Sequence, residues 1–179
     1  MNLNHINHPL TYIIAVALVV GIAGAFWYLS GETVPVPQAP GLSPPAYDFA
    51  LPAIDGTTVR LSDFRGKAVL LNVWQPNCGT CEDEVRALAR LQRAYRSRLA
   101  VIVIAMGTDA PAARDRLAPL KPDFPVVIGD DTIATNYPGQ VVPRSYLVDQ
   151  SGRLRAMVLK HPRSPYGYFQ RLVAFVIAS

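Results

Sequence analysis

The sequence predicts an α/β domain in which helices flank a mixed central sheet. Residues 68–74 and 99–106 are continuous apolar runs rich in branched side chains, which is typical of strands that helices cover on both faces. Between them, residues 81–98 place apolar side chains on one helical face and arginines largely on another. We therefore expect a strand, a helix and a second, parallel strand at the centre of the domain.

The N-terminal third of the chain is apolar and has no Lys or Arg before Arg60. After a short tail over residues 1–9, residues 10–29 carry no charge, and a helix of this length crosses a hydrocarbon core of about 30 Å. We expect a transmembrane anchor. A cleaved secretory signal is the alternative, because Ala23-Gly24-Ala25 resembles a cleavage site. Either one exports the residues that follow.

Residues 30–45 contain five prolines, which predicts a semi-rigid, extended linker rather than a packed element. Residues 46–179 are long enough to bury one core and form the folded domain. In chain order, its remaining expected elements are a hairpin extension over 49–61 with a turn at Asp55-Gly56, a helix over 110–120, a short strand over 124–128, a helical turn over 132–137, an antiparallel hairpin of 146–149 and 154–159 around Gly152, and a terminal helix over 166–177.

Both cysteines lie in Cys78-Gly79-Thr80-Cys81, between the first central strand and the helix after it. A C-x-x-C pair in this context is typical of redox chemistry. The N-terminus of a helix stabilises an anion, so Cys78 is predicted to be the attacking thiolate, while Cys81, one turn deeper, is placed to resolve a mixed disulfide. Two cysteines and three histidines cannot build a multi-ligand zinc cluster, so no metal site is expected, and His161 is expected to be a surface loop residue.

Several further short motifs accompany the cysteine pair. Together they make residues 47–179 resemble the thioredoxin superfamily, and more closely its membrane-anchored periplasmic reductases of the TlpA/ResA type. The resemblance implies a thioredoxin-like fold. The matching residues are Asp48-Phe49, Leu51-Pro52, Asp55-Gly56, Leu61-Ser62-Asp63-Phe64-Arg65-Gly66-Lys67, Asn72-Val73-Trp74, Cys78 to Cys81, and Pro143 through Asp149 to Gly152.

The resemblance also implies roles for residues near the cysteines. Pro143 corresponds to a cis-proline packed beside the disulfide, and the backbone of Val142 to the segment that pairs with an extended substrate. Asn72 stands where thioredoxin has a buried aspartate that assists proton transfer. Glu84 matches an acidic residue near the cysteines, and we expect it to exchange a proton with Cys81. The alternative is that Glu84, like the two acidic residues before it, merely complements the helix N-terminus.

Trp74 and Asn77 are expected to support the redox site. Trp74 ends one of the matching motifs, while Asn77 replaces the tryptophan that usually precedes the first cysteine and is expected to cap the helix. Arg86 replaces a proline common in relatives, so partner specificity is expected to differ. Acidic residues 82–84 disfavour a thiolate at Cys78, which favours a moderate reductant over a disulfide-introducing oxidant.

These expectations describe an exported, single-pass protein of the inner (cytoplasmic) membrane, anchored in the lipid bilayer through residues 10–29, with its C-terminal domain in the periplasm or otherwise outside the cytoplasm. It would reduce disulfides of envelope proteins through a Cys78–Cys81 dithiol–disulfide cycle, with no other cofactor. The resemblance implies a membrane dithiol as electron donor and cytochrome c maturation as one client route. No nucleic-acid partner is expected.

Two other functions remain open. One is a peroxiredoxin-like thiol peroxidase, because residues 61–67 and 81–84 also echo that branch, although its Pro-x-x-x-Thr/Ser-x-x-Cys arrangement is missing. The other is a copper-binding thiol chaperone, because two soft sulfur ligands suit Cu(I).

Overall fold

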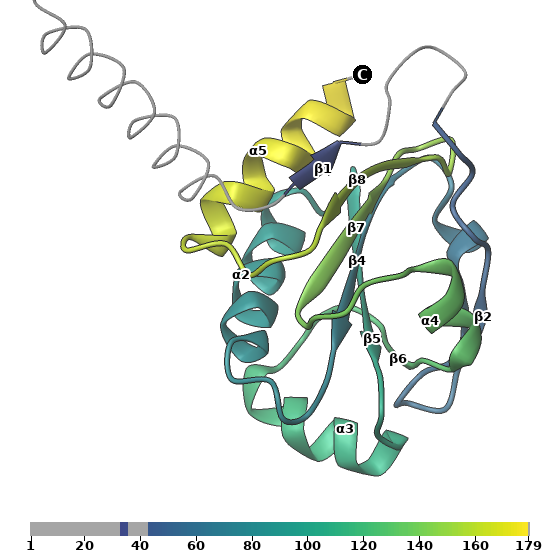
Figure 1. Ribbon diagram of the computed structural model, residues 1–179, viewed down its shortest axis with the longest axis vertical. Coiled ribbons are helices and arrows are strands. Elements are labelled where there is room, and N and C mark those ends of the chain that lie inside the picture. The colour runs from purple at the N-terminus through teal and green to yellow at the C-terminus, as the bar shows by residue number, and fades with distance from the viewer. Residues whose placement is uncertain (1–32, 36–42, 179) are drawn as a thin grey trace, which may run out of the picture. The chain divides into compact units, whose positions relative to one another are not determined.

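A six-stranded mixed sheet forms the centre of the described chain, which comprises residues 33–35 and 43–178 of a computed structural model (Figure 1). The strands follow the order β1-β8-β7-β4-β5-β6, and β2 and β3 form a separate hairpin. The strands are β1 (Thr33–Pro35), β2 (Ala50–Pro52), β3 (Thr58–Arg60), β4 (Ala68–Trp74), β5 (Leu99–Ala105), β6 (Val126–Ile128), β7 (Arg144–Val148) and β8 (Leu154–Val158). The helices are α2 (Cys81–Ala94), α3 (Ala110–Leu117), α4 (Asp131–Asn136) and α5 (Pro165–Ala178), with 3-10 turns η1 (Leu61–Phe64) and η2 (Ala118–Leu120).

Strand β4 lies at the middle of the sheet and connects to β5 through α2. The β4–β5 pair is parallel, as is β5–β6, whereas β7 runs antiparallel to both β4 and β8. The predicted mixed sheet between helices is confirmed. In the β4–β7 register Asn72 lies opposite Ser145, and Val73 opposite Arg144. The end of β4 that leads to the cysteines therefore meets the beginning of β7.

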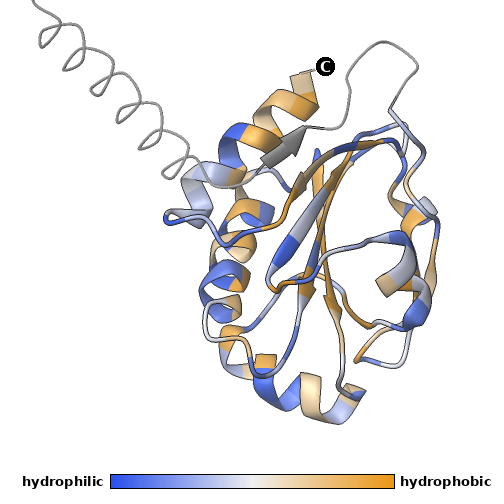
Figure 2. Cartoon of the chain, viewed as in Figure 1, coloured by the Kyte–Doolittle hydropathy of each residue, from blue (hydrophilic) through white to orange (hydrophobic). Residues whose placement is uncertain are grey.

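Each face of the sheet has its own core. Successive strand residues point to opposite faces, so Leu70 packs with α2 and α5 while Leu71 packs with the β2–β3 hairpin and α4. Figure 2 shows the hydrophobic residues concentrated along the central strands. Every residue of β4 and β5 is buried. This explains why both strands, apart from Asn72 in β4, are apolar rather than alternating.

The predicted elements form with some shifts at their ends. The hairpin extension turns at Gly56, whose φ of 89° is a conformation that favours glycine. Helix α2 ends at Ala94 rather than residue 98, because the amides of Arg98 and Leu99 bond to the Tyr95 carbonyl in a turn that leads into β5. Strand β7 begins at Arg144, two residues before the prediction.

The predicted boundary between linker and domain is wrong. Thr33–Pro35, expected in an extended spacer, form a strand that pairs antiparallel with β8. Near residue 46, the Leu154 amide donates to the Pro44 carbonyl and the Ala46 amide to the Gly152 carbonyl. Residues 43–45 therefore belong to the domain, because their backbone bonds to the start of β8 and to the turn before it.

The expected tail over residues 1–9, the anchor over 10–29 and the rest of the linker lie outside the described residues. No helix within residues 33–35 and 43–178 is long and apolar enough to span a bilayer.

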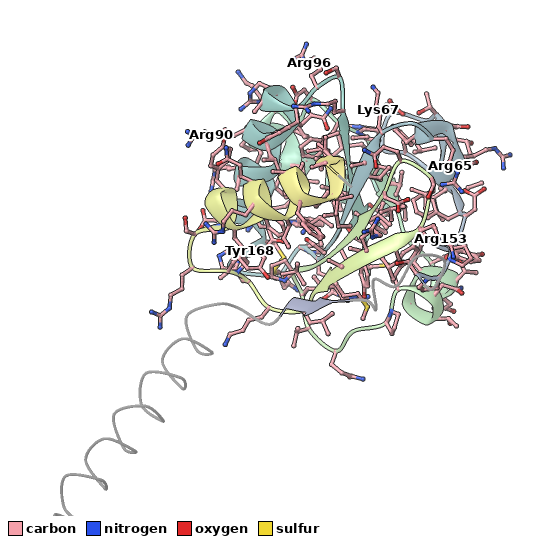
Figure 3. All side chains as sticks on the ribbon, turned by 90° about the horizontal axis from the view of Figure 1, so that it is seen from above. Arg65, Lys67, Arg90, Arg96, Arg153 and Tyr168 are labelled. Atoms are coloured by element: carbon pink, nitrogen blue, oxygen red, sulfur yellow. A yellow bond between two sulfur atoms is a disulfide. The ribbon has the colours of Figure 1, made fainter. Side chains whose placement is uncertain are left out.

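Basic side chains line the solvent-facing surface of α2. Arg86, Arg90 and Arg93 of α2 and Arg96 in the turn after it are all exposed, and Figure 3 shows Arg90 and Arg96 at the periphery of the domain. Arg90 also lies over the Tyr166 ring of α5, 4.0 Å from its centroid. The predicted arginine face of this helix is confirmed.

Candidate active site

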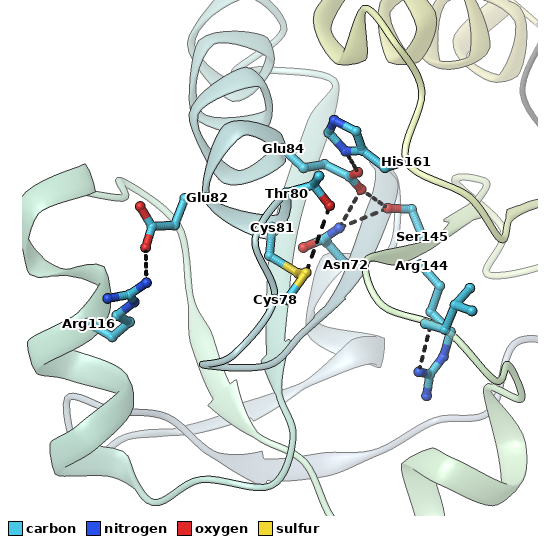
Figure 4. The surroundings of a disulfide bond; sticks show 11 residues. Asn72, Cys78, Thr80, Cys81, Glu82, Glu84, Arg116, Arg144, Ser145 and His161 are labelled. Carbon is cyan, nitrogen blue, oxygen red and sulfur yellow. Dashed lines mark hydrogen bonds and ion pairs between the residues drawn. A yellow bond between two sulfur atoms is a disulfide. The ribbon is translucent and has the colours of Figure 1, made fainter. Parts of the chain in front are cut away.

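Cys78 and Cys81 are joined by a disulfide between the end of β4 and the start of α2 (Figure 4). Their Cα atoms are 5.4 Å apart. Cys78 is partly exposed, whereas Cys81 is fully buried as the first residue of α2. A partner protein can therefore reach the Cys78 sulfur, while the Cys81 sulfur faces the protein interior.

Helix α2 starts at Cys81, as predicted, but its cap is not the predicted residue. Its N-cap is Thr80, and Asn77, predicted to be the cap, lies exposed in the preceding turn. The Cys78 amide bonds to the Gln75 carbonyl and the Cys81 amide to the Cys78 carbonyl. These two turns occupy residues 75–81, so the Asn77 prediction is wrong, and Cys78 precedes the first helical turn.

Two of the three acidic residues at the start of α2 form surface ion pairs. A Glu82 oxygen lies 2.7 Å from an Arg116 nitrogen of α3, and an Asp83 oxygen lies 2.8 Å from an Arg86 nitrogen. Arg86 also approaches Glu82 at 3.5 Å. These partners offset the negative charge that was expected to disfavour a Cys78 thiolate, so the predicted direction of electron flow loses part of its basis.

Glu84 differs from its acidic neighbours because it is buried, with 1% of its surface exposed. Its Oε1 accepts hydrogen bonds from Asn72 Nδ2 at 2.7 Å and Ser145 Oγ at 3.0 Å, and its Oε2 lies 3.0 Å from His161 Nδ1. Burial raises the pKa of Glu84, although the contacts with His161, Ser145 and Asn72 oppose this effect. Glu84 follows Cys81 by three residues, so both lie on one face of α2.

His161 is part of this cluster, which corrects the prediction of a surface loop histidine. Its side chain is 22% exposed and reaches Glu84 from the segment after β8 (Figure 4). Ser145 was also missed. Its position opposite Asn72 in the β4–β7 register could have indicated it once the strands were paired.

Asn72 and Trp74 lie on β4 with their side chains buried. Asn72 Nδ2 donates to Glu84 and, at 3.0 Å, to Ser145 Oγ, which fixes the orientation of the amide. Within the described part of the chain, Asn72 Oδ1 and Trp74 Nε1 are buried without a hydrogen-bond partner. The Asn72 oxygen is thus a spare acceptor in the oxidised state. In the view of Figure 4 the amide lies between the disulfide and the Glu84 carboxylate.

The Val142–Pro143 peptide bond is cis, and β7 begins at the next residue. Arg144 is buried, and it donates to the carbonyls of Tyr137 and Val141, each at 3.3 Å. The sequence analysis did not identify Arg144, whose hydrogen bonds hold the loop before Pro143 in place. Because Arg144 is paired with Val73 near the end of β4, Pro143 lies at the cysteine end of the sheet.

Two hollows of about 680 Å³ each adjoin these residues. One includes Cys78 and is bordered by Asn77 and Arg116. The second, called here the proline groove, is mostly apolar. It is lined by residues 138–143, Met157 and residues 159–161, which include Val142, Pro143 and His161. Among the described residues, no group of three or more His, Cys, Asp or Glu side chains is arranged to hold a metal ion.

The mixed sheet, the C-x-x-C disulfide at the end of a central strand and the cis-proline before its neighbour define a thioredoxin-like domain. Comparison with known proteins agrees. Residues 43–157 match the AhpC/TSA family, and the chain belongs to it.

Relatives and solved structures carry related names. The thioredoxin-like protein YneN of Bacillus subtilis is 32% identical over 111 residues, and the match covers 60% of this chain and 65% of that protein. A thiol-disulfide oxidoreductase ResA of Bacillus thuringiensis is 29% identical over 152 residues, covering 83% and 86%. The crystal structure of a thiol:disulfide interchange protein from Chlorobium tepidum superposes with a TM-score of 0.69 at 22% identity, covering 75% and 97%. The predicted fold and the resemblance to thioredoxin-like proteins are confirmed.

Proposed function

We propose that the protein is a thiol–disulfide oxidoreductase that reduces disulfides in exported proteins. The observation that carries this proposal is the asymmetry of the two sulfurs. Cys78 is open to a partner, whereas Cys81 is buried on the helix face that also carries the buried Glu84. A disulfide that served stability alone would need neither an exposed sulfur nor a buried carboxylate beside its helix.

The reaction begins from the dithiol form. The Cys78 thiolate attacks one sulfur of a partner disulfide, forming a mixed disulfide and releasing the other partner sulfur as a thiolate. Cys81 then loses its proton and attacks the Cys78 sulfur, which releases the second partner thiolate and restores the Cys78–Cys81 disulfide. Two electrons pass from the protein dithiol to the partner. The protons from Cys78 and Cys81 end on the two partner thiolates.

Glu84 accepts the Cys81 proton in this scheme. A buried carboxylate whose pKa is raised is a better base than an ordinary one, because the ideal pKa of a proton acceptor lies near the working pH. The Asn72 oxygen, without a partner in the disulfide form, supplies an acceptor for the Cys81 thiol after reduction. The backbone of Val142, beside the proline groove, binds the extended partner chain.

Export and anchoring rest on the uncharged run over residues 10–29, which supports a single-pass protein of the inner membrane with the domain in the periplasm. A membrane dithiol would then resupply electrons. The relatives named thiol-disulfide oxidoreductase ResA support disulfide exchange as the reaction. Envelope proteins as substrates, with apocytochrome c as one client, are proposed from the resemblance of the sequence alone.

A Cys81→Ala variant tests the proposal, because it should hold partners as mixed disulfides on Cys78. Expressed in the native host, it should yield covalent adducts that dithiothreitol releases, while a matched Cys78→Ala variant yields none. Equal amounts of adduct on both variants, or none on either, would contradict the mechanism. Consumption of hydrogen peroxide by a Cys81→Ser protein would instead support a thiol peroxidase.

A further inference from the structure

The Glu84 carboxylate has one titratable partner among the contacts that hold it. Asn72 from β4 and Ser145 from β7 have side chains that do not ionise, whereas the imidazole of His161 can take up and release a proton. His161 also borders the proline groove and is partly exposed. His161 therefore lies between the Glu84 carboxylate, which is buried, and the proline groove, which is open to solvent.

A buried carboxylate is costly unless a charged or hydrogen-bonding partner compensates it. At 3.0 Å, His161 Nδ1 and Glu84 Oε2 can share one proton, located either on the imidazole with Glu84 ionised or on Glu84 with the imidazole neutral. Two places for one proton, one of them accessible to water, are what a proton relay requires.

We propose that His161 is a positioning residue that holds Glu84 ready to accept the Cys81 proton and passes a proton to the proline groove. This inference rests on the proposed reductase function. The relay starts with Glu84 ionised and the shared proton on His161, which is then an imidazolium. When Cys81 attacks the mixed disulfide, its proton goes to the Glu84 carboxylate, and the imidazolium loses its negative partner. His161 then releases a proton to solvent at the groove, where the departing partner thiolate takes one up. No electrons pass through the relay.

Several other ionisable side chains lie near the relay. Lys160 and Arg163 flank His161 in the sequence, and α5, which packs against α2, carries Tyr166, Tyr168 and Arg171. Lysine, arginine and tyrosine side chains keep their charge between about pH 5 and 8. Glu82 and Asp83 on α2 itself are engaged with arginines at the surface. A transition in this pH range therefore reports on the Glu84–His161 pair or on a cysteine.

His161→Gln tests the relay, because glutamine keeps a hydrogen-bonding side chain but does not titrate. The reduced protein is mixed with oxidised glutathione, and two steps are followed from pH 5 to 8: formation of the adduct on Cys78 and its resolution by Cys81. We expect the variant to form the adduct at the wild-type rate but to resolve it at least about tenfold more slowly at pH 7, as loss of one charge-assisted hydrogen bond implies. The midpoint of the Glu84 carboxyl titration, followed by carbon-13 NMR, should move upward because a contact that lowers its pKa is lost.

Two further variants make the outcome decisive. Arg96→Gln removes an exposed positive charge from the turn after α2, where it pairs with Asp123, and should leave both steps unchanged. In a Glu84→Gln background, His161→Gln should have no further effect on resolution. The inference is overturned if His161→Gln keeps the wild-type pH profile of resolution, or slows it equally in the Glu84→Gln background. A wild-type protein that never resolves the adduct would contradict the proposed function itself.

Discussion

Replacing Glu84 in two ways separates its contribution to stability from its contribution to chemistry. Glu84→Ala removes the whole carboxylate, whereas Glu84→Gln keeps a side-chain oxygen that can accept from Asn72 and Ser145. Both variants lose the proton acceptor, so both should resolve mixed disulfides about a hundredfold or more slowly. Their stabilities should differ because they leave different groups without partners.

The size of this difference follows from the contacts. In Glu84→Ala, one amide hydrogen of Asn72 and the hydroxyl of Ser145 lose their acceptor inside the core. A buried donor without a partner costs about 1 to 3 kcal/mol, so the two together cost about 2 to 6 kcal/mol. His161 is partly exposed and can bond to water, so it adds little. We expect Glu84→Ala to be at least about 2 kcal/mol less stable than Glu84→Gln.

The pH dependence has a definite sign. Burial raises the pKa of Glu84 above its ordinary value of 4.5, so the folded state binds the Glu84 proton more tightly than the unfolded state. Its contribution to stability is therefore fully present below about pH 4.5 and is lost as the pH rises through the folded pKa. Relative to Glu84→Gln, the wild type should lose stability over that range.

Urea unfolding of the oxidised proteins, followed by circular dichroism between pH 4 and 8, measures these differences. The two variants must first be shown to retain the wild-type circular dichroism spectrum. The free energies of unfolding of Glu84→Ala and Glu84→Gln should differ by more than about 0.5 kcal/mol, which is roughly the error of such extrapolations. If they agree within that error, the assignment of the buried hydrogen bonds is refuted.

Three further predictions concern the scaffold. Burial raises the pKa of Asp149, but hydrogen bonds from Arg153, Ser151 and Arg155 outweigh it, so the pKa is lowered. Asp149→Asn should therefore lower the free energy of unfolding by about 1 to 3 kcal/mol above pH 4. This difference from the wild type should disappear as the pH falls through the lowered pKa of Asp149. Gly152→Ala should cost at least about 1 kcal/mol in urea unfolding, because Gly152 has a φ of 82° and an added Cβ would meet the Arg65 guanidinium. Leu88→Ala should cost about 2 to 5 kcal/mol by the same measurement, because Leu88 is fully buried; a smaller loss would mean that the core relaxes around the cavity.

Local sequence patterns were sufficient to predict those elements whose structure depends mainly on neighbouring residues. The apolar runs of β4 and β5 and the amphipathic pattern of α2 were enough to predict the centre of the sheet. A strand that is buried on both faces is apolar along its length, and this can be recognised in the sequence of that strand alone. The cysteine pair could also be recognised from the sequence, because a redox-active disulfide of this kind joins two residues within one turn of the chain.

Contacts between distant segments were not visible in the same way. His161 is 77 residues from Glu84, and a histidine between Lys160 and Pro162 carries no periodicity that points inward. Thr33–Pro35 form a strand because β8 offers unpaired backbone groups, although their own sequence favours an extended linker. The start of α2 depends on two successive turns, which shifted its cap from Asn77 to Thr80.

The pairing of β1 with β8 has a consequence for how the domain meets extended chains. Open strand edges recruit extended chains and lead to aggregation. Here one edge of the sheet ends in a three-residue strand whose last residue, Pro35, has no amide hydrogen to donate, and at the other edge the Ile54 amide bonds to the Val126 carbonyl of β6. The described part of the chain thus offers an extended chain little unpaired backbone at either edge of the sheet, which disfavours co-assembly by strand addition.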